Sequence, residues 1–236
     1  LHVHTTYSAD AFEQSLSFSG GEGAHPPADA CDYARYCSQL DFWSINDHAF
    51  ALTPDRWQRT KESVRQCNAV AGAVPDTVAF AGWEWTQSGA NPETHYGHKN
   101  IIFPGLADDE LPPRPIMAAS DLSNFNVELD AGGMITEALR GVLLDSTHRP
   151  DHWRNLKYTA ATFTVPPCPD DTPQSELGLD CREVAETPAE LFSRLENLVD
   201  DYLVIPHGNS WGLYTPPGSN WKKQLVGANH NPQRQT

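Results

Sequence analysis

Residues 42–48, Phe-Trp-Ser-Ile-Asn-Asp-His, decide the fold class, because they read as a buried strand that ends abruptly in polar side chains. Residues 53–55, Thr-Pro-Asp, predict the start of a helix that runs toward Gly72, with threonine as the N-cap and proline at the first helical position. Before this stretch, apolar spacing behind two prolines predicts a helix at 27–40, and residues 1–5 are predicted to form a strand. The chain therefore begins with strands and helices in alternation.

Further strands are predicted at 77–85, 98–103 and 202–206, and a further helix is predicted at 188–200. Repeated strand-then-helix units favour a parallel α/β sheet or barrel, in which ligands bind at the carboxyl ends of the strands. An acidic segment with proline clusters, at about 105–187, interrupts this pattern, and we interpret it as a long irregular insertion. We expect one α/β domain over the whole chain.

Composition excludes some classes of function. The 31 acidic and 16 basic residues give a formal net charge of -15, which works against nucleic-acid binding. No apolar run approaches the roughly 20 residues that span a bilayer, so no membrane span is expected. The five cysteines form no Cys-x-x-Cys pair, but Cys168 and Cys181 flank a proline-containing loop that a disulfide could close. That possible disulfide and the low lysine content favour a periplasmic or secreted location over a cytoplasmic one.

Metal-ligand residue types stand at the predicted strand ends. In His2-Val3-His4 the two imidazoles lie two residues apart on a strand, so both project to one face and can bind one ion. Such a pair alone is more often structural. The signal is the ordered recurrence of these residue types, and the set consists of His2, His4, His48, Glu84, His98 and His207. Asp47, beside His48, could orient that histidine or cap the following turn.

Glu84 lies in an otherwise apolar strand end, where an unpaired carboxylate is costly to bury. A metal ion would supply its partner, and a carboxylate can bridge two ions; the alternative is a salt bridge to Lys99. An antiparallel hairpin between the strands at 77–85 and 98–103 would place His98 beside Glu84. His95 falls in the connecting loop, where it could be a ligand, a substrate contact or a surface residue.

The stretch Leu-His-Val-His-Thr-Thr-Tyr-Ser-Ala-Asp at 1–10, followed by Ile-Asn-Asp-His at 45–48, resembles the opening motifs of the PHP superfamily, named for polymerase and histidinol phosphatase. Residues 82–86, 98–103 and 205–212 look like a branch of large PHP-like proteins known only as a domain of unknown function. The resemblance implies a distorted seven-stranded (β/α)7 TIM-like barrel, with two or three divalent ions, such as Zn, Mn or Fe, at the strand carboxyl ends.

The resemblance also implies how the ligands divide. His2, His4 and Glu84 would hold one ion, and Glu84, His98 and His207 a second; Asp10 and His48 would begin a third. The family's last motif, Asp-x-His, has no copy here, because Asn229-His230-Asn231 lacks a carboxylate. We therefore expect a fragment that stops before this motif.

These features predict a metal-dependent hydrolase, most simply a phosphoesterase that acts on a small phosphate ester through a metal-bridging water. Glu84, His48 and His95 are the candidate catalytic residues, and Lys99 is a candidate contact to a phosphate oxygen. Two alternatives stay open. One is amidohydrolase-like cleavage of an amide or ester bond, and the other is a non-catalytic metal-binding module.

Overall fold

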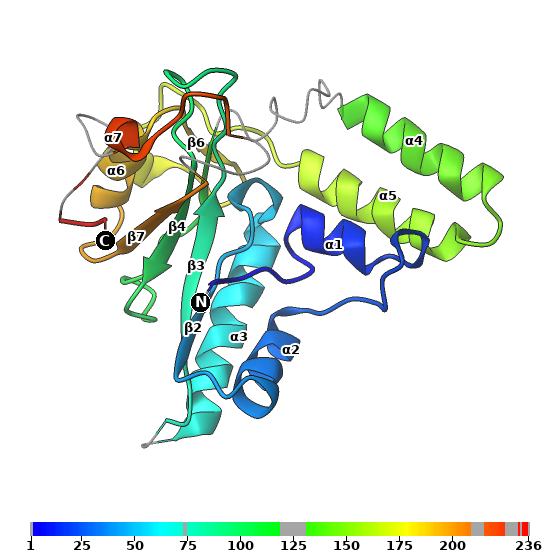
Figure 1. Cartoon of the computed structure of the whole chain (residues 1–236), viewed down its shortest axis with the longest axis horizontal. Coiled ribbons are helices and arrows are strands. Elements are labelled where there is room, and N and C mark those ends of the chain that lie inside the picture. Colours follow the sequence, from blue (N-terminus) through cyan, green and yellow to red (C-terminus); the bar gives the residue numbers. More distant parts are fainter. Residues whose placement is uncertain are drawn as a thin grey trace.

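A five-stranded mixed sheet forms the centre of the computed structural model, which describes residues 2–72, 75–118, 131–208, 215–224, 231 and 233–235. The strands lie in the spatial order β1 (His2–Val3), β2 (Phe42–Ile45), β3 (Val78–Trp85), β4 (His98–Phe103) and β7 (Leu203–His207), as Figure 1 shows. All five strands were predicted, within a few residues at their ends.

Strand direction brings the predicted ligands to one edge of this sheet. β1, β2 and β3 are parallel, while β4 runs antiparallel to both β3 and β7. The carboxyl ends of β1, β2, β3 and β7 therefore meet the amino end of β4 at the same edge. The predicted hairpin between β3 and β4 is confirmed, and His98 pairs in register with His207.

Helices cover one face of the sheet. α3 (Pro54–Ala71) packs on β3, and α2 (Pro27–Asp32) packs on α3. Trp57 of α3 meets Trp83 of β3 edge to face, with ring centroids 5.3 Å apart, in the centre of the core. The predicted N-cap of α3 is confirmed, because the Thr53 side chain accepts a hydrogen bond from the backbone N–H of Arg56.

The helix predicted at 27–40 changes its winding along its length. After α2 the chain forms a π-helical turn at η2 (Tyr33–Cys37), which adds a residue to the turn and shifts the direction of later side chains. Cys31 and Ala34 are buried, as the apolar spacing predicts, whereas Cys37, expected on the same apolar face, is exposed after this turn.

The segment predicted as an irregular insertion contains regular structure. β5 (Ile116–Ala118) and β6 (Glu183–Ala185) pair in parallel as a separate two-stranded sheet. Two helices, α4 (Ala131–Leu144) and α5 (Arg149–Phe163), pack against each other between them in the sequence. Figure 1 shows α5 beside α1 (Ala9–Ser15) and α4 on the far side of α5, away from the main sheet.

Short elements complete the described part of the chain. The helix predicted at 188–200 is α6 (Pro188–Glu196), with Thr187 as its N-cap. The other short elements are η1 (Ser17–Ser19), η3 (Ala49–Ala51), η5 (Gln174–Glu176) and α7 (Trp221–Gln224). Asn229 and His230, the nearest candidates for the absent last motif, lie outside the described residues. No helix in the described ranges is long and apolar enough to cross a membrane.

The predicted (β/α)7 barrel is wrong, although the α/β class is compatible with the structure. In the described ranges the main sheet is a curled, open half-barrel in which β1 and β7 are the outer strands and do not pair with each other. The physical reason lies in strand pairing. β5 and β6 hydrogen-bond to one another rather than to the main sheet, so they do not extend it toward closure.

Two disulfides tie the fold together. Cys168–Cys181, which sequence spacing suggested, closes the loop before β6. Cys31–Cys67, which was not predicted, joins α2 to α3 beneath the sheet. Cys37 is the free cysteine.

Candidate metal centre

Glu84 occupies the centre of the polar edge because of strand alternation. Its neighbour Trp83 packs toward α3, so the Glu84 side chain points to the opposite face of β3, away from α3. Asn100 of β4 lies beside Glu84 in register. Only 2% of the Glu84 side chain is exposed.

Four imidazoles surround this buried carboxylate. The distances from the Glu84 carboxylate oxygens are 3.0 Å to Nε2 of His4, 2.6 Å to Nδ1 of His98, 3.4 Å to Nε2 of His207 and 3.7 Å to Nδ1 of His48. Burial alone would raise the pKa of Glu84, but hydrogen bonds from His207, His4 and His98 hold it well below its ordinary value. The alternative, a salt bridge from Lys99 to Glu84, is absent from the described residues, because Lys99 Nζ donates to the Tyr96 carbonyl instead.

The ligand atoms gather in two groups of three, and Glu84 belongs to both. One group contains His2, Glu84 and His207, and the other contains His4, His48 and Glu84; within each group the atoms lie within 4.8 Å of one another. His2 stacks on His207 with ring centroids 5.1 Å apart. Desolvation and the neighbouring His207 lower the pKa of His2 to about 4, which favours the neutral, metal-binding imidazole. The structure thus brings the expected residues together but groups them differently. His2 lies with His207 rather than with His4, and His4 lies with His48.

Asp10 lies at the open side of the cluster, where α1 begins. One of its carboxylate oxygens is 3.5 Å from Nε2 of His48 and 3.9 Å from Nδ1 of His4. About half of this side chain is exposed, in contrast to Glu84. Asp10 and His48 therefore lie close together, as expected.

Two hydroxyl groups hold His4 and His48 in place. Ser8 Oγ lies 2.8 Å from Nδ1 of His4 and accepts the backbone N–H of His48 at 3.2 Å, so it links β1 to the end of β2. Thr86 Oγ1 lies 2.6 Å from Nδ1 of His48. Sequence reasoning missed both residues, although each lies within four residues of a predicted ligand.

Asp47 acts on the backbone rather than on a ligand. It is fully buried and accepts hydrogen bonds from the Thr5 backbone N–H at 2.5 Å and from the Thr5 hydroxyl at 2.8 Å. Burial raises the pKa of Asp47 to about 6. The residue therefore anchors the chain just after His4 to the end of β2; it does not cap the turn before Ala49.

His95 is a buried structural residue rather than a surface one. Its Nδ1 accepts the backbone N–H of Gly89 at 3.1 Å, and its Nε2 donates to the carbonyl of Gly208 at 2.9 Å. Burial lowers its pKa, which matches the neutral tautomer these two bonds require. Because both ring nitrogens bind backbone, the predicted catalytic role of His95 does not fit; the ring instead ties the loop before β4 to the residue after His207.

Lys99 also lies away from the cluster. It follows His98 on β4, so it points to the opposite face, beside Trp85. The side chain is buried, its Nζ donates to the Tyr96 carbonyl at 2.8 Å, and desolvation lowers its pKa to about 7. The predicted contact between Lys99 and a phosphate at the cluster is therefore wrong.

The backbone bonds of His95 lead to a prediction. His95→Ala removes no ligand, so we expect it to weaken metal binding about 10- to 100-fold, as loss of a group that supports a ligand usually does. Isothermal titration with Zn²⁺ measures the change, and His25→Ala, at an exposed histidine, is the matched control. An affinity equal to that of the wild type would contradict the role assigned to His95.

An open groove of about 640 Å³ lies on the face of the sheet away from α3 and reaches the cluster at His2. Its walls are mainly apolar and come from β2, β3, β4 and β7, with Phe42, Phe80, Ile102 and Ile205 among them. Asn100, beside Glu84 in register, also lines it. The groove therefore gives one side of the cluster an open approach.

A second group of histidines lies apart from the Glu84 cluster. At the turn between α4 and α5, Asp145 contacts Nδ1 of His148 at 2.9 Å and Nε2 of His152 at 3.2 Å. The same carboxylate accepts backbone N–H groups at the start of α5. This trio is a useful comparison for the Glu84 cluster because it has similar residue types at a different place.

The chain was compared with protein-family models, with curated proteins and with solved structures. None of the three comparisons found a match.

Proposed function

We propose that the chain is a metal-dependent hydrolase and that its substrate is a phosphate ester. The observation that carries this proposal is Glu84, a carboxylate with 2% exposure that contacts histidines from four different strand ends. A buried carboxylate is stable only with compensating charge, and imidazoles with a carboxylate are the donor set that Zn²⁺, Mn²⁺ and Fe²⁺ accept. The residues present therefore fit divalent ions.

The two groups that share Glu84 suit a pair of ions with a bridging carboxylate. His2 and His207 would hold one ion and His4 and His48 the other. Bound divalent ions supply an activated water near neutral pH and neutralise charge on a transferring phosphoryl group. No nucleophilic side chain is then required.

The chain's own residues orient and support this centre. Ser8 and Thr86 fix the His4 and His48 rings, and Asp47 fixes the backbone after His4. Asp10 faces Nε2 of His48 at the exposed side of the cluster, where an arriving substrate would meet them. We assign Asp10 the orientation of the His48 ring, because a carboxylate beside a ligand imidazole holds that ring in place.

Phosphate esters are preferred over amides because of a family resemblance, and the position of Lys99 argues against one form of amide chemistry. The resemblance of residues 1–10 and 45–48 to the PHP superfamily supports phosphoester chemistry. Amidohydrolases generally use a carboxylated lysine or a glutamate to bridge their metal ions. Lys99 points away from the cluster, so it cannot be such a lysine, and an amidohydrolase site here would use the glutamate. Amide hydrolysis is therefore the second reaction to assay.

The cysteines support a proposal for the compartment. Four of the five are joined in the two disulfides, and such bonds persist in oxidising surroundings. We propose a periplasmic or secreted location.

The proposed reaction is tested with purified, metal-loaded chain and a panel of phosphate mono- and diesters, with an amide and a carboxylic ester as further substrates. We expect phosphoester turnover that is lost in the His4→Ala/His48→Ala variant and kept in His148→Ala/His152→Ala, which removes the same residue types from the α4–α5 turn. Turnover of amide substrates alone would replace the proposal by the second reaction. No turnover of any substrate by a metal-loaded chain would favour a non-catalytic module.

A further inference from the structure

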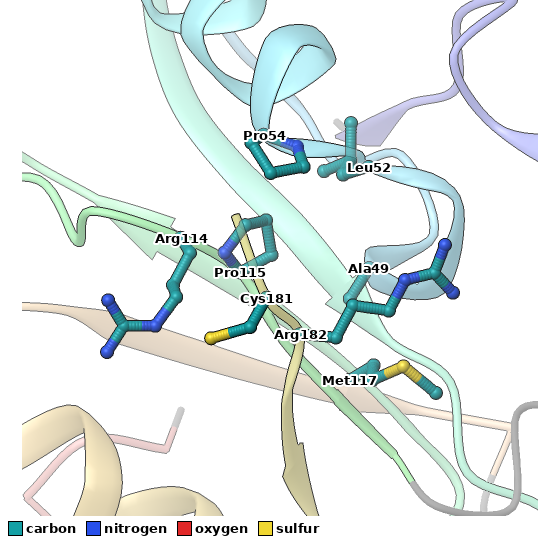
Figure 2. Close-up of a pocket in the computed structure, with 8 residues that line it drawn as sticks. All are labelled: Ala49, Leu52, Pro54, Arg114, Pro115, Met117, Cys181 and Arg182. Carbon is teal, nitrogen blue, oxygen red and sulfur yellow. The ribbon is translucent and has the colours of Figure 1, made fainter. Parts of the chain in front are cut away.

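Arg182, the residue before β6, carries a buried positive charge without a partner among the described residues. Its side chain is 9% exposed, and its Nε and Nη2 atoms are fully buried with no hydrogen bond. No ion pair joins its guanidinium to any carboxylate in the described ranges. Figure 2 shows the side chain extending past Ala49, on the opposite side from Arg114.

The two unpaired atoms define what would fit there. Nε and Nη2 form one edge of the planar guanidinium, and their N–H bonds point the same way, the arrangement that binds carboxylate and phosphate oxygens. The third nitrogen, Nη1, is not among the fully buried unpaired atoms, and the residue as a whole is 9% exposed. Arg182 is therefore arranged to receive an anionic oxygen.

A small pocket of about 10 Å³ adjoins this arginine. Such a volume holds roughly one water-sized atom, which suits a single oxygen of a larger anion. The other lining residues are mostly apolar, among them Leu52, Pro115 and Met117. Ala49 also lines the pocket and directly follows His48, so the pocket lies behind a strand end that carries a predicted metal ligand.

The nearby charges do not neutralise Arg182. The adjacent Glu183 is taken by Arg114, at 2.7 Å, and by Arg194, at 3.5 Å. Desolvation, together with the positive charge of Arg56, lowers the pKa of Arg182 to about 10. Burying a cation without a partner costs free energy, and a bound anion would offset that cost. The excess of arginine here is local, because the chain as a whole has a net charge of -15.

We propose that Arg182 anchors an oxyanion site, which takes the phosphate or carboxylate group of a small anionic ligand independently of the metal centre. Inorganic phosphate, acetate and chloride are the probes. Phosphate offers several acceptor oxygens to the guanidinium edge, acetate offers two, and chloride offers none. Both oxyanions are therefore expected to bind, whereas chloride at the same ionic strength is not.

The test compares Arg182→Met with the wild type by thermal unfolding over a series of millimolar anion concentrations. In oxyanion-free buffer the variant is expected to melt at or above the wild-type temperature, because it replaces an unpaired buried charge by an apolar side chain. Phosphate is expected to raise the wild-type melting temperature saturably, by roughly 3–6 °C at ten times its dissociation constant, and to leave the variant unchanged. Arg140→Met, at an exposed arginine of α4, should respond like the wild type.

The measurements are made on chelator-treated and on metal-loaded chain, so that phosphate bound at the Glu84 cluster is separated from phosphate bound at Arg182. An equal phosphate response in wild type and Arg182→Met would overturn the proposal, since the anion would then bind elsewhere. A variant that melts well below the wild type in oxyanion-free buffer, in a chain without a saturable phosphate response, would also overturn it. That result would mean that Arg182 pairs with a carboxylate of the chain itself.

Discussion

Glu84→Gln is expected to lose metal binding almost completely while the chain keeps its fold. The change removes one charge and preserves the shape of the side chain, but both ligand groups contain Glu84, so both lose their carboxylate at once. Loss of a group that merely supports a ligand costs about 10- to 100-fold in affinity, and loss of a shared ligand should exceed about 100-fold. Isothermal titration with Zn²⁺ and Mn²⁺ measures the effect.

The control for this variant is Glu137→Gln, which removes a carboxylate with 72% exposure from α4, far along the chain from the cluster. It should bind metal as the wild type does. Circular dichroism of both variants checks that the fold persists. If Glu84→Gln retained the wild-type affinity, the bridging position assigned to Glu84 would be wrong.

Removal of the Cys31–Cys67 disulfide by a double alanine substitution is expected to give the largest loss of stability. The bond closes a separation of 36 residues, and the chain-entropy relation assigns about 4 kcal/mol to a loop of that size. Both cysteines are buried between α2 and α3, so lost packing adds to the effect. Urea unfolding under non-reducing conditions, with free energies extrapolated to water, measures the difference.

Two further variants calibrate this expectation. The Cys168–Cys181 bond spans 13 residues, for which the same relation gives about 3 kcal/mol, so its removal should cost less. Cys37→Ala, at the exposed free cysteine, should leave stability unchanged. A Cys31→Ala/Cys67→Ala chain as stable as Cys37→Ala would show that this disulfide does not hold α2 on α3.

Local signals predicted the elements that carry the site. The apolar run before His48, the Thr53 cap and the turn-rich loop before His98 depend on neighbouring residues, and the structure has a strand, a helix and a hairpin there. The orientation of Lys99 could also have been predicted from its neighbours in the sequence. Adjacent residues of a strand face opposite sides, so a ligand at His98 already argued against a phosphate contact from Lys99.

The remaining features depend on contacts between distant segments. Whether a sheet closes is decided by which strands pair, and nothing in the short runs at β5 and β6 reveals that they pair with each other. The burial of His95 depends on Gly208, 113 residues away, and the Cys31–Cys67 bond depends on how α2 meets α3. The sequence likewise does not show that Arg182 lacks a partner, because its neighbour Glu183 pairs with Arg114 and Arg194, which are distant in the chain or on another element.

Metal stoichiometry of the wild-type chain tests the central claim most directly. Purified protein is stripped with chelator, reconstituted separately with Zn²⁺ and Mn²⁺, desalted, and analysed by inductively coupled plasma mass spectrometry against a measured protein concentration. The two groups around Glu84 predict two tightly bound ions per chain, both absent from Glu84→Gln. Metal content no higher than that of the desalting buffer, in a folded chain, would contradict the assignment of this cluster as a metal centre.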